Sequence, residues 1–180
     1  MHMANVVKQW TLEEVHSLPD DGNKYELVRG ELFVTPPPTD PHETIGARLT
    51  RLLDPYVESQ RLGYVFHPRS VMRFEGSEVE PDLMVRAPHT KADASWDDAP
   101  VPILIVEILS PSTRRRDQVQ KRGLYMDAGV AEYWMGDGER RTITAVRPGQ
   151  GDVVAREVLV WSPPGVSVSL TLEVARVFGA

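Results

Sequence analysis

The chain has 180 residues, of which 41% are hydrophobic and 26% are charged, the composition of an ordinary soluble globular protein. This length fits one domain, so we treat residues 1–180 as a single unit and set aside Met1 and His2, which resemble a cloning remnant before Met3. The absence of cysteine excludes disulfides and thiolate metal sites, and a net charge of −6 argues against binding nucleic acid through charge alone.

Capping and turn signals divide the first 60 residues. Residues 11–18 open with capping-box spacing and predict a short helix. Strands 25–28 and 31–34 should form a hairpin across an Arg-Gly turn. Residues 40–43 combine a cap acceptor, a proline and a glutamate, which predicts the start of a longer helix. Pro55 falls inside that helical pattern, so we expect a kink or a break there.

Strands dominate the remainder of the chain. The predicted strands are 64–66, 70–74, 79–85, 102–109, 132–135, 142–146, 153–160 and 166–172. Two helices are expected among them, at 114–128 and at 173–178, and the polar segment 87–100 should be a loop that could cover a site. The result is an α/β fold, a mixed sheet flanked by helices with more strands than a regular βαβ alternation.

Membrane and export signals are missing from the sequence. No apolar segment approaches membrane-spanning length, and the first residues have no signal-peptide apolar region. We therefore expect a cytoplasmic protein without a membrane partner.

Glu107 lies in the most hydrophobic stretch of the chain, residues 103–109. An unpaired carboxylate in such a place costs several kcal/mol, so a cation or a metal should accompany it. Strand alternation places Glu107 on one face, and the same alternation places Asp82 on one face of strand 79–85. If the two strands are neighbours, Asp82, Glu107 and the backbone carbonyl of Ile108 could hold Mg²⁺ or Mn²⁺.

The helix that follows this strand carries a second group of candidates. Asp117, Lys121 and Tyr125 share one helical face at i, i+4 spacing. The Lys121 ammonium could orient a water molecule or stabilise charge on a phosphate. Spacing alone leaves open the alternative of a structural Glu107–Lys121 ion pair without a metal.

Five basic residues crowd the same helix with one acid among them: Arg114, Arg115, Arg116, Lys121 and Arg122, interrupted by Asp117. A basic face of this kind is compatible with a nucleic-acid substrate. A solvated helix face explains the same pattern equally well.

Several motifs in a fixed order resemble the Uma-two family of bacterial endonucleases, which belongs to the PD-(D/E)XK restriction-endonuclease-like superfamily. The motifs are Pro81-Asp82, residues 106–113, Asp117, Lys121, Tyr125, residues 129–134, and, nearer the N-terminus, residues 25–32 and His42. The resemblance extends from about Thr11 to Phe178. It implies a restriction-endonuclease-like core with extra N- and C-terminal strands, and hydrolysis of DNA with Mg²⁺ or Mn²⁺.

The resemblance also implies roles for individual residues. Asp82 and Glu107 correspond to the metal-binding carboxylates. The superfamily lysine normally stands two residues after the second carboxylate, where this chain has Leu109, and Lys121 is its expected replacement. An acidic residue of the N-terminal hairpin should complete the site.

We expect that acid to be Glu31, with Glu26 as the second choice, although either could instead be a surface or cross-strand residue. His42 could contact the substrate or the metal, or simply pack or cap a helix. Cutting both strands of a duplex would suit a homodimer.

Two alternatives to an active DNA endonuclease remain open at this point. The missing lysine at Leu109 and the acidic net charge would fit a nuclease-like binding or interaction module without turnover. A phosphoesterase acting on small phosphorylated substrates has less support, since no motif for such a ligand is present.

Overall fold

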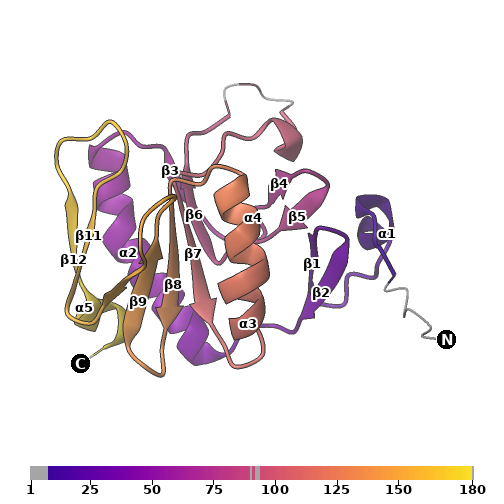
Figure 1. Ribbon diagram of the computed structural model, residues 1–180, viewed down its shortest axis with the longest axis horizontal. Helices are drawn as coiled ribbons and strands as arrows, with labels where there is room; N and C mark the ends of the chain where they lie inside the picture. The colour runs from indigo at the N-terminus through magenta and orange to yellow at the C-terminus, as the bar shows by residue number, and fades with distance from the viewer. Residues whose placement is uncertain (1–7, 90, 92–93, 180) are drawn as a thin grey trace.

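The structure is a computed structural model in which residues 8–89, 91 and 94–179 are described. Its centre is a six-stranded sheet with the strand order β10-β9-β8-β7-β6-β3 (Figure 1). The strands of this sheet are β3 (Tyr64–Phe66), β6 (Leu83–Arg86), β7 (Leu104–Leu109), β8 (Glu132–Asp137), β9 (Thr142–Val146) and β10 (Val153–Ala155). β7 and β8 run parallel, and the other neighbouring strands run antiparallel.

A smaller sheet of four strands lies to one side, in the order β2-β1-β5-β4. Its strands are β1 (Lys24–Val28), β2 (Glu31–Thr35), β4 (Met72–Phe74) and β5 (Ser77–Val79). β1 and β2 form the predicted hairpin, whose two turn residues, Arg29 and Gly30, both have positive φ angles of 51° and 84°. Such a turn matches the right-handed twist of the strands it joins.

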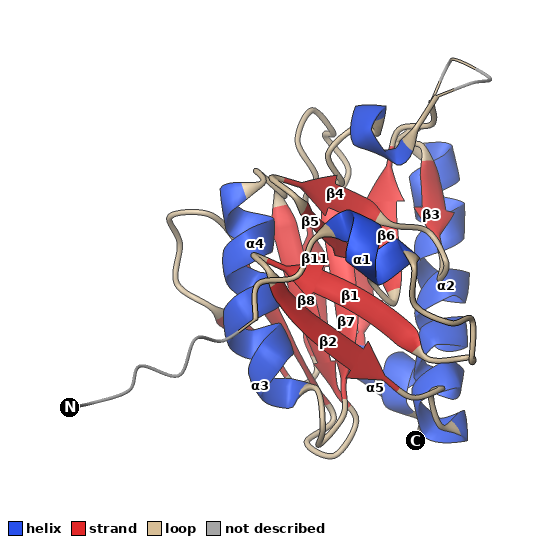
Figure 2. Ribbon diagram, turned by 90° about the vertical axis from the view of Figure 1, so that its right-hand side faces the viewer, coloured by secondary structure: helices blue, strands red, loops and turns tan. Residues whose placement is uncertain are grey.

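One face of the six-stranded sheet is covered by α2 (Asp40–Ser59), α5 (Val174–Phe178) and a ribbon of β11 (Val158–Trp161) and β12 (Leu170–Glu173). Figure 2 shows the sheet between α2 on one side and α3 and α4 on the other. Leu49 and Leu53 of α2 pack in one hydrophobic cluster with Val106, Trp134 and Trp161. The periodic apolar positions of α2 thus form the buried face that the sequence predicts.

The opposite face is covered by the crossover that joins β7 to β8, and by the smaller sheet. This crossover consists of α3 (Arg114–Arg116), the π-helical segment η2 (Asp117–Lys121) and α4 (Arg122–Asp127). The sequence predicts this helix but not its π-helical turn, which inserts a residue relative to α-helical geometry. Gly129, with φ of 81°, follows the end of α4 as expected.

Two short helices complete the described chain. α1 (Leu12–His16) has the predicted capping box, in which Thr11 and Glu14 bond each other's backbone. η1 (Trp96–Asp98) lies in the segment that we predict as a loop. No helix within the described residues is both long enough and apolar enough to cross a lipid bilayer.

Three sequence predictions were wrong in their details. The strand predicted at 153–160 is divided into β10 of the six-stranded sheet and β11 of the two-stranded ribbon. α2 continues through Pro55 to Ser59 instead of breaking there. The single strand predicted at 79–85 is two strands, because the chain leaves the smaller sheet after Val79 and enters the larger sheet at Leu83. Pro81 occupies this switch and has no backbone N–H for a ladder hydrogen bond.

Candidate active site

Asp82 is the last residue before β6 and lies beside the end of β7. Leu83 pairs with Val106 in the antiparallel ladder, so Asp82 comes opposite the next residues of β7. Its Oδ2 accepts a hydrogen bond from the backbone N–H of Ile108 at 2.7 Å, and His42 Nε2 lies 3.1 Å from the same oxygen. These contacts hold the carboxylate where the sequence places it, at the junction of the two strands.

The pKa of Asp82 lies well below its ordinary value. Burial opposes ionisation, but the hydrogen bond from His42, the charge of Lys24 and the Ile108 N–H together outweigh it. The pKa of His42 is raised in return, because its bond to Asp82 outweighs the effect of its own burial. Asp82 is therefore ionised at neutral pH and favours the protonated form of His42.

Glu107 points from β7 towards the crossover helix and is only 2% exposed. Its Oε1 accepts hydrogen bonds from Lys121 Nζ at 2.7 Å and from the Tyr125 hydroxyl at 2.6 Å. Burial raises the pKa of Glu107 to about 7; the attraction of Lys121 opposes the rise, and the negative charge of Asp82 adds to it. The lysine expected at this carboxylate is therefore present, and it comes from the helix.

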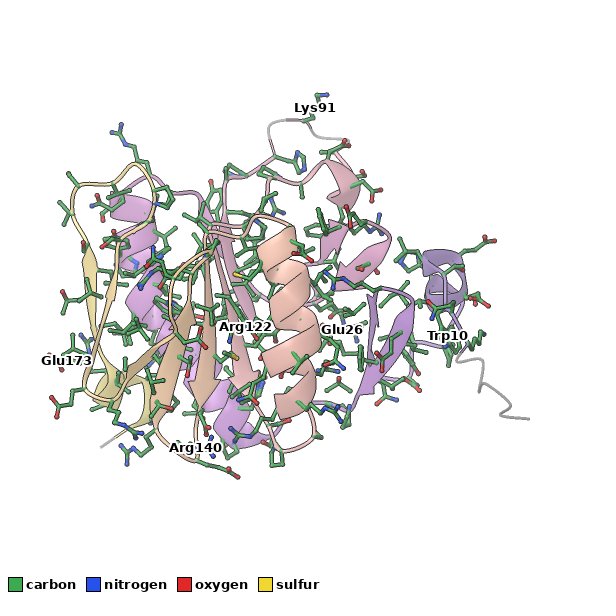
Figure 3. The ribbon with its side chains drawn as sticks, in the orientation of Figure 1. Trp10, Glu26, Lys91, Arg122, Arg140 and Glu173 are labelled. Carbon is green, nitrogen blue, oxygen red and sulfur yellow. The ribbon has the colours of Figure 1, made fainter. Side chains whose placement is uncertain are left out.

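Lys121 is fully buried and contacts a second carboxylate. Its Nζ lies 2.6 Å from Glu26 Oε1, and Glu26 also accepts the backbone N–H of Glu80 at 2.9 Å. Figure 3 shows Glu26 on the β1 side of α4. The pKa of Lys121 is raised despite its burial, because Glu107 and Glu26 attract its charge.

The pKa values of the two carboxylates that share this ammonium shift in opposite directions. Burial works against ionisation of both, but Lys121, Lys24 and Arg116 outweigh it at Glu26, so the Glu26 pKa is lowered. At Glu107, burial and the nearby acids outweigh the attraction of Lys121, so the Glu107 pKa is raised. We therefore regard Glu26 as the firmly ionised partner of Lys121 and Glu107 as the carboxylate that takes up a proton more readily.

Arg116 and Asp117 extend this buried network. Arg116 lies 3.4 Å from Glu26 and 3.4 Å from Asp117, and it donates to the Thr35 hydroxyl at 2.8 Å. Among the contacts of the described residues, the Asp117 carboxylate bonds Arg116, and none joins it to Lys121, which contacts Glu26 and Glu107 instead. Sequence reasoning missed Arg116, which it treated as one of a run of basic residues.

That basic run is largely neutralised by acidic partners. Arg114 bonds Asp137 at 2.5 Å, and Arg122 bonds Asp152 through two contacts of 2.7 Å. Four of the five basic residues of this predicted face are therefore in ion pairs, and Arg115 is exposed.

Glu31 does not join the network that we expected it to complete. It is exposed at the start of β2, opposite Val28, and no hydrogen bond or ion pair within the described residues connects it to Glu107 or Lys121. The acid that the N-terminal hairpin supplies is Glu26, the second choice from the sequence.

A cleft of about 770 Å³ opens beside Asp82. Its lining combines α2, the segment after β2 and the ends of β6 and β7, and includes Lys24, His42, Arg51, Arg69, Glu80, Asp82, Ile108 and Ser110. Glu26, Glu107 and Lys121 are absent from the lining. The site therefore has a front layer, Asp82 with His42, Ile108 and Lys24, and a buried rear layer of Glu26, Glu107, Lys121 and Tyr125.

The donor atoms at this junction suit a hard divalent cation. In the described part of the chain, no hydrogen bond reaches Asp82 Oδ1 or Glu107 Oε2, so each carboxylate keeps one oxygen available. The N–H of Ile108 faces Asp82, and its carbonyl points to the same side because both groups of an extended residue do so.

These oxygens do not make a complete metal cage. Within the described residues, no three His, Asp or Glu side chains converge closely enough to hold a metal by themselves. Mg²⁺ commonly takes one or two carboxylates and obtains its other ligands from water and substrate phosphates, so the residues present fit it.

Comparison with known proteins agrees with this fold. The model of the Uma2 family, described as "Putative restriction endonuclease", matches residues 12–177. A crystal structure from Anabaena variabilis, titled a putative nuclease belonging to DUF820, superposes with a TM-score of 0.76 at 22% sequence identity. The match covers 94% of this chain and 97% of that chain, which confirms the predicted mixed α/β fold of the restriction-endonuclease-like kind. No curated protein matches the sequence.

Proposed function

Because the chain belongs to the Uma2 family of restriction-endonuclease-like proteins, we propose that it is a divalent-metal-dependent endonuclease that hydrolyses phosphodiester bonds in DNA. The observation that carries the proposal is the Ile108 N–H bond to Asp82, 2.7 Å long, which fixes Asp82 at the strand junction beside Glu107. Asp82 lines a cleft large enough for a segment of a nucleic-acid strand, and Glu107 lies behind it in the buried rear layer.

Asp82, Glu107 and the Ile108 carbonyl would hold the metal. A bound Mg²⁺ or Mn²⁺ would polarise the phosphate and lower the pKa of the attacking water. His42 orients Asp82 from the α2 side, and Lys121 and Tyr125 both bond Glu107 Oε1 and not Oε2. We assign Lys121 a positioning role, since its ammonium is fully buried between two carboxylates.

The proposal is tested by incubating the protein with supercoiled plasmid and with single-stranded DNA in Mg²⁺ or Mn²⁺. Asp82→Asn and Glu107→Gln should each lower the cleavage rate by more than about 100-fold, because loss of a ligand should exceed the loss seen on removing an outer partner. Glu58→Gln, a change of the same chemistry at an exposed position of α2, should cleave like the wild type. Cleavage that survives both site substitutions would contradict the assignment.

A second candidate function is a nuclease-like binding module without turnover. It is favoured by the same buried ion pairs, since Lys121 already satisfies Glu107 and Glu26 and the usual lysine position holds Leu109. Isothermal titration with Mn²⁺ distinguishes the two candidate functions. If the protein is an endonuclease, the wild type should bind the cation and the Glu107→Gln variant should not. A wild-type protein that binds DNA but neither binds Mn²⁺ nor cleaves would favour the module.

The proposed function also bears on the oligomeric state of the protein. A duplex cut on both strands would suit a homodimer that presents two such clefts. Sedimentation with and without duplex DNA tests this, and a monomer in both conditions would contradict it.

A further inference from the structure

We propose that Lys24 is the residue that binds the substrate phosphate. Lys24 lies at the front of the site, where a phosphate can reach it, whereas Lys121 is buried and cannot contact a phosphate in the cleft. The inference rests on the proposed function in one respect, namely that the phosphate belongs to a nucleic-acid strand. It concerns a residue outside the Asp82, Glu107 and Lys121 set.

The contacts of Lys24 leave donors free towards the cleft. Lys24 begins β1, and its Nζ donates to the Glu80 carbonyl at 2.9 Å. The same nitrogen lies 3.7 Å from Asp82 Oδ1, which is an ion pair beyond hydrogen-bond distance. An ammonium group has three N–H donors, so two of them remain for a ligand.

Exposure also distinguishes the two lysines. The Lys24 side chain is 18% exposed and lines the cleft, whereas the Lys121 side chain is 0% exposed and does not. Lys121 would have to leave both Glu26 and Glu107 to reach a ligand in the cleft. Leu109, at the usual superfamily position, is apolar and packs against the core cluster of the crossover helix.

Charge gives a reason why a cation is needed at this position. The cleft lining includes the acids Glu43, Glu80 and Asp82, so an entering phosphate meets negative charge. The arginines that line it are Arg51, which is exposed on α2, and Arg69, which is 62% exposed and 3.9 Å from Asp20. His42 also lines it, but its Nε2 is already bonded to Asp82 at 3.1 Å. Lys24 lies beside Asp82, where the phosphate must lie if Asp82 is to act on it, and unlike His42 it is not within hydrogen-bond distance of that carboxylate.

A purely structural role is the alternative, in which Lys24 only fastens β1 to the sheet switch at Glu80–Asp82. The two roles differ in the salt dependence of nucleic-acid binding. Each phosphate contact contributes a slope of about 0.7 (single strand) to 0.9 (duplex) to the fall of log affinity with log salt concentration. A lysine that only fastens the backbone contributes nothing to that slope.

The test measures fluorescence anisotropy of labelled single-stranded and duplex oligonucleotides over a salt series in EDTA, where no cleavage occurs. Lys24→Met and Lys24→Gln should each reduce the slope by about 0.7–0.9, and Lys24→Arg should retain it. Lys8→Met, which removes the same charge outside the cleft lining, should leave the slope unchanged. Two neutral variants are included because Lys24→Gln can still donate to the Glu80 carbonyl if Lys24→Met fails to fold.

An unchanged slope in the Lys24 variants would overturn the inference, and so would a wild-type protein that binds neither oligonucleotide. Cleavage by the wild type in Mn²⁺ is measured in parallel. If the wild type cleaves and the Lys24 slope is unchanged, the inference fails and the endonuclease stands. If the slope falls as expected and the wild type does not cleave, the endonuclease fails and the phosphate contact stands.

Discussion

Replacing Lys121 with methionine tests the buried half of the site. Methionine keeps most of the apolar stem and removes the ammonium that contacts Glu26 and Glu107 at 2.6 and 2.7 Å. Both carboxylates are then left almost without solvent, at 0% and 2% exposure. Lys121→Met therefore exposes the cost of buried, uncompensated charge.

The size of the effect follows from what each carboxylate retains. Removing one partner of a buried pair costs about 3–5 kcal/mol. The loss should not double, because Glu107 can be protonated near neutral pH and Glu26 keeps Arg116 at 3.4 Å and the Glu80 N–H at 2.9 Å. For a domain of this size that range lowers Tm by about 6–20 °C.

The assay is guanidinium denaturation followed by circular dichroism at pH 7 in EDTA. Glu107→Gln alone should cost less than Lys121→Met, since Lys121 keeps Glu26. The triple variant Glu26→Gln, Lys121→Met, Glu107→Gln removes all three charges, so it should recover much of the loss. A Lys121→Met protein within about 1 kcal/mol of the wild type, or a triple variant less stable than Lys121→Met, would refute the reasoning.

Three further predictions concern pH, backbone conformation and the π-helical turn. The pKa of Glu107 rises from 4.5 to about 7 on folding, so its contribution to the free energy of unfolding is complete below pH 4.5 and is lost as pH rises to 7. Glu107→Gln should flatten the resulting decline of Tm with pH, measured in EDTA. Identical Tm-against-pH profiles for the wild type and Glu107→Gln would contradict this. In urea denaturation, Gly63→Ala should lower the free energy of unfolding by about 1–3 kcal/mol more than Gly76→Ala does. Both glycines have positive φ, but only a Cβ at Gly63 would meet backbone, 2.1 Å from the Arg86 carbonyl oxygen. Equal losses of stability would count against this. Deleting Val119, which is 61% exposed in the π-helical turn, should rotate Arg116 away from Glu26 and reduce DNA cleavage about 10-fold or more. The control Val119→Ala should cleave DNA like the wild type. A deletion variant as active as Val119→Ala would contradict the role of the turn.

The sequence leads directly to the pairing of Glu107 with Lys121. A carboxylate inside an apolar strand requires a cation, and the helix that returns over the same face supplies one. Tyr125, one helical turn further on, reaches the same oxygen. Strand alternation points to Asp82, although Asp82 lies in the switch just before β6 and not within the strand.

The choice between Glu26 and Glu31 shows where the sequence reasoning failed. We favoured Glu31 for its place after the turn, yet a turn-proximal residue of an edge strand is exposed. Glu26 lies between Tyr25 and Leu27-Val28, an acid in an apolar run like Glu107. The criterion applied to Glu107 would have selected Glu26 as well.

Other features depend on tertiary contacts and have no signal in the local pattern. Arg116 belongs to a run of three arginines, and only the fold buries it between Glu26 and Asp117. The π-helical turn is also invisible in the apolar spacing, because its exposed residues, such as Val119, are not periodic. Pro81 was the available sign that strand 79–85 is divided.

The central claim is that Asp82 and Glu107 together hold one divalent cation at the floor of the cleft. The most direct measurement is an anomalous difference map from crystals of the protein soaked in Mn²⁺. We expect one peak in contact with both carboxylates in the wild type, and none in Glu107→Gln. Crystals that hold Mn²⁺ elsewhere, or that keep Asp82 and Glu107 bound only to His42 and Lys121, would contradict the claim.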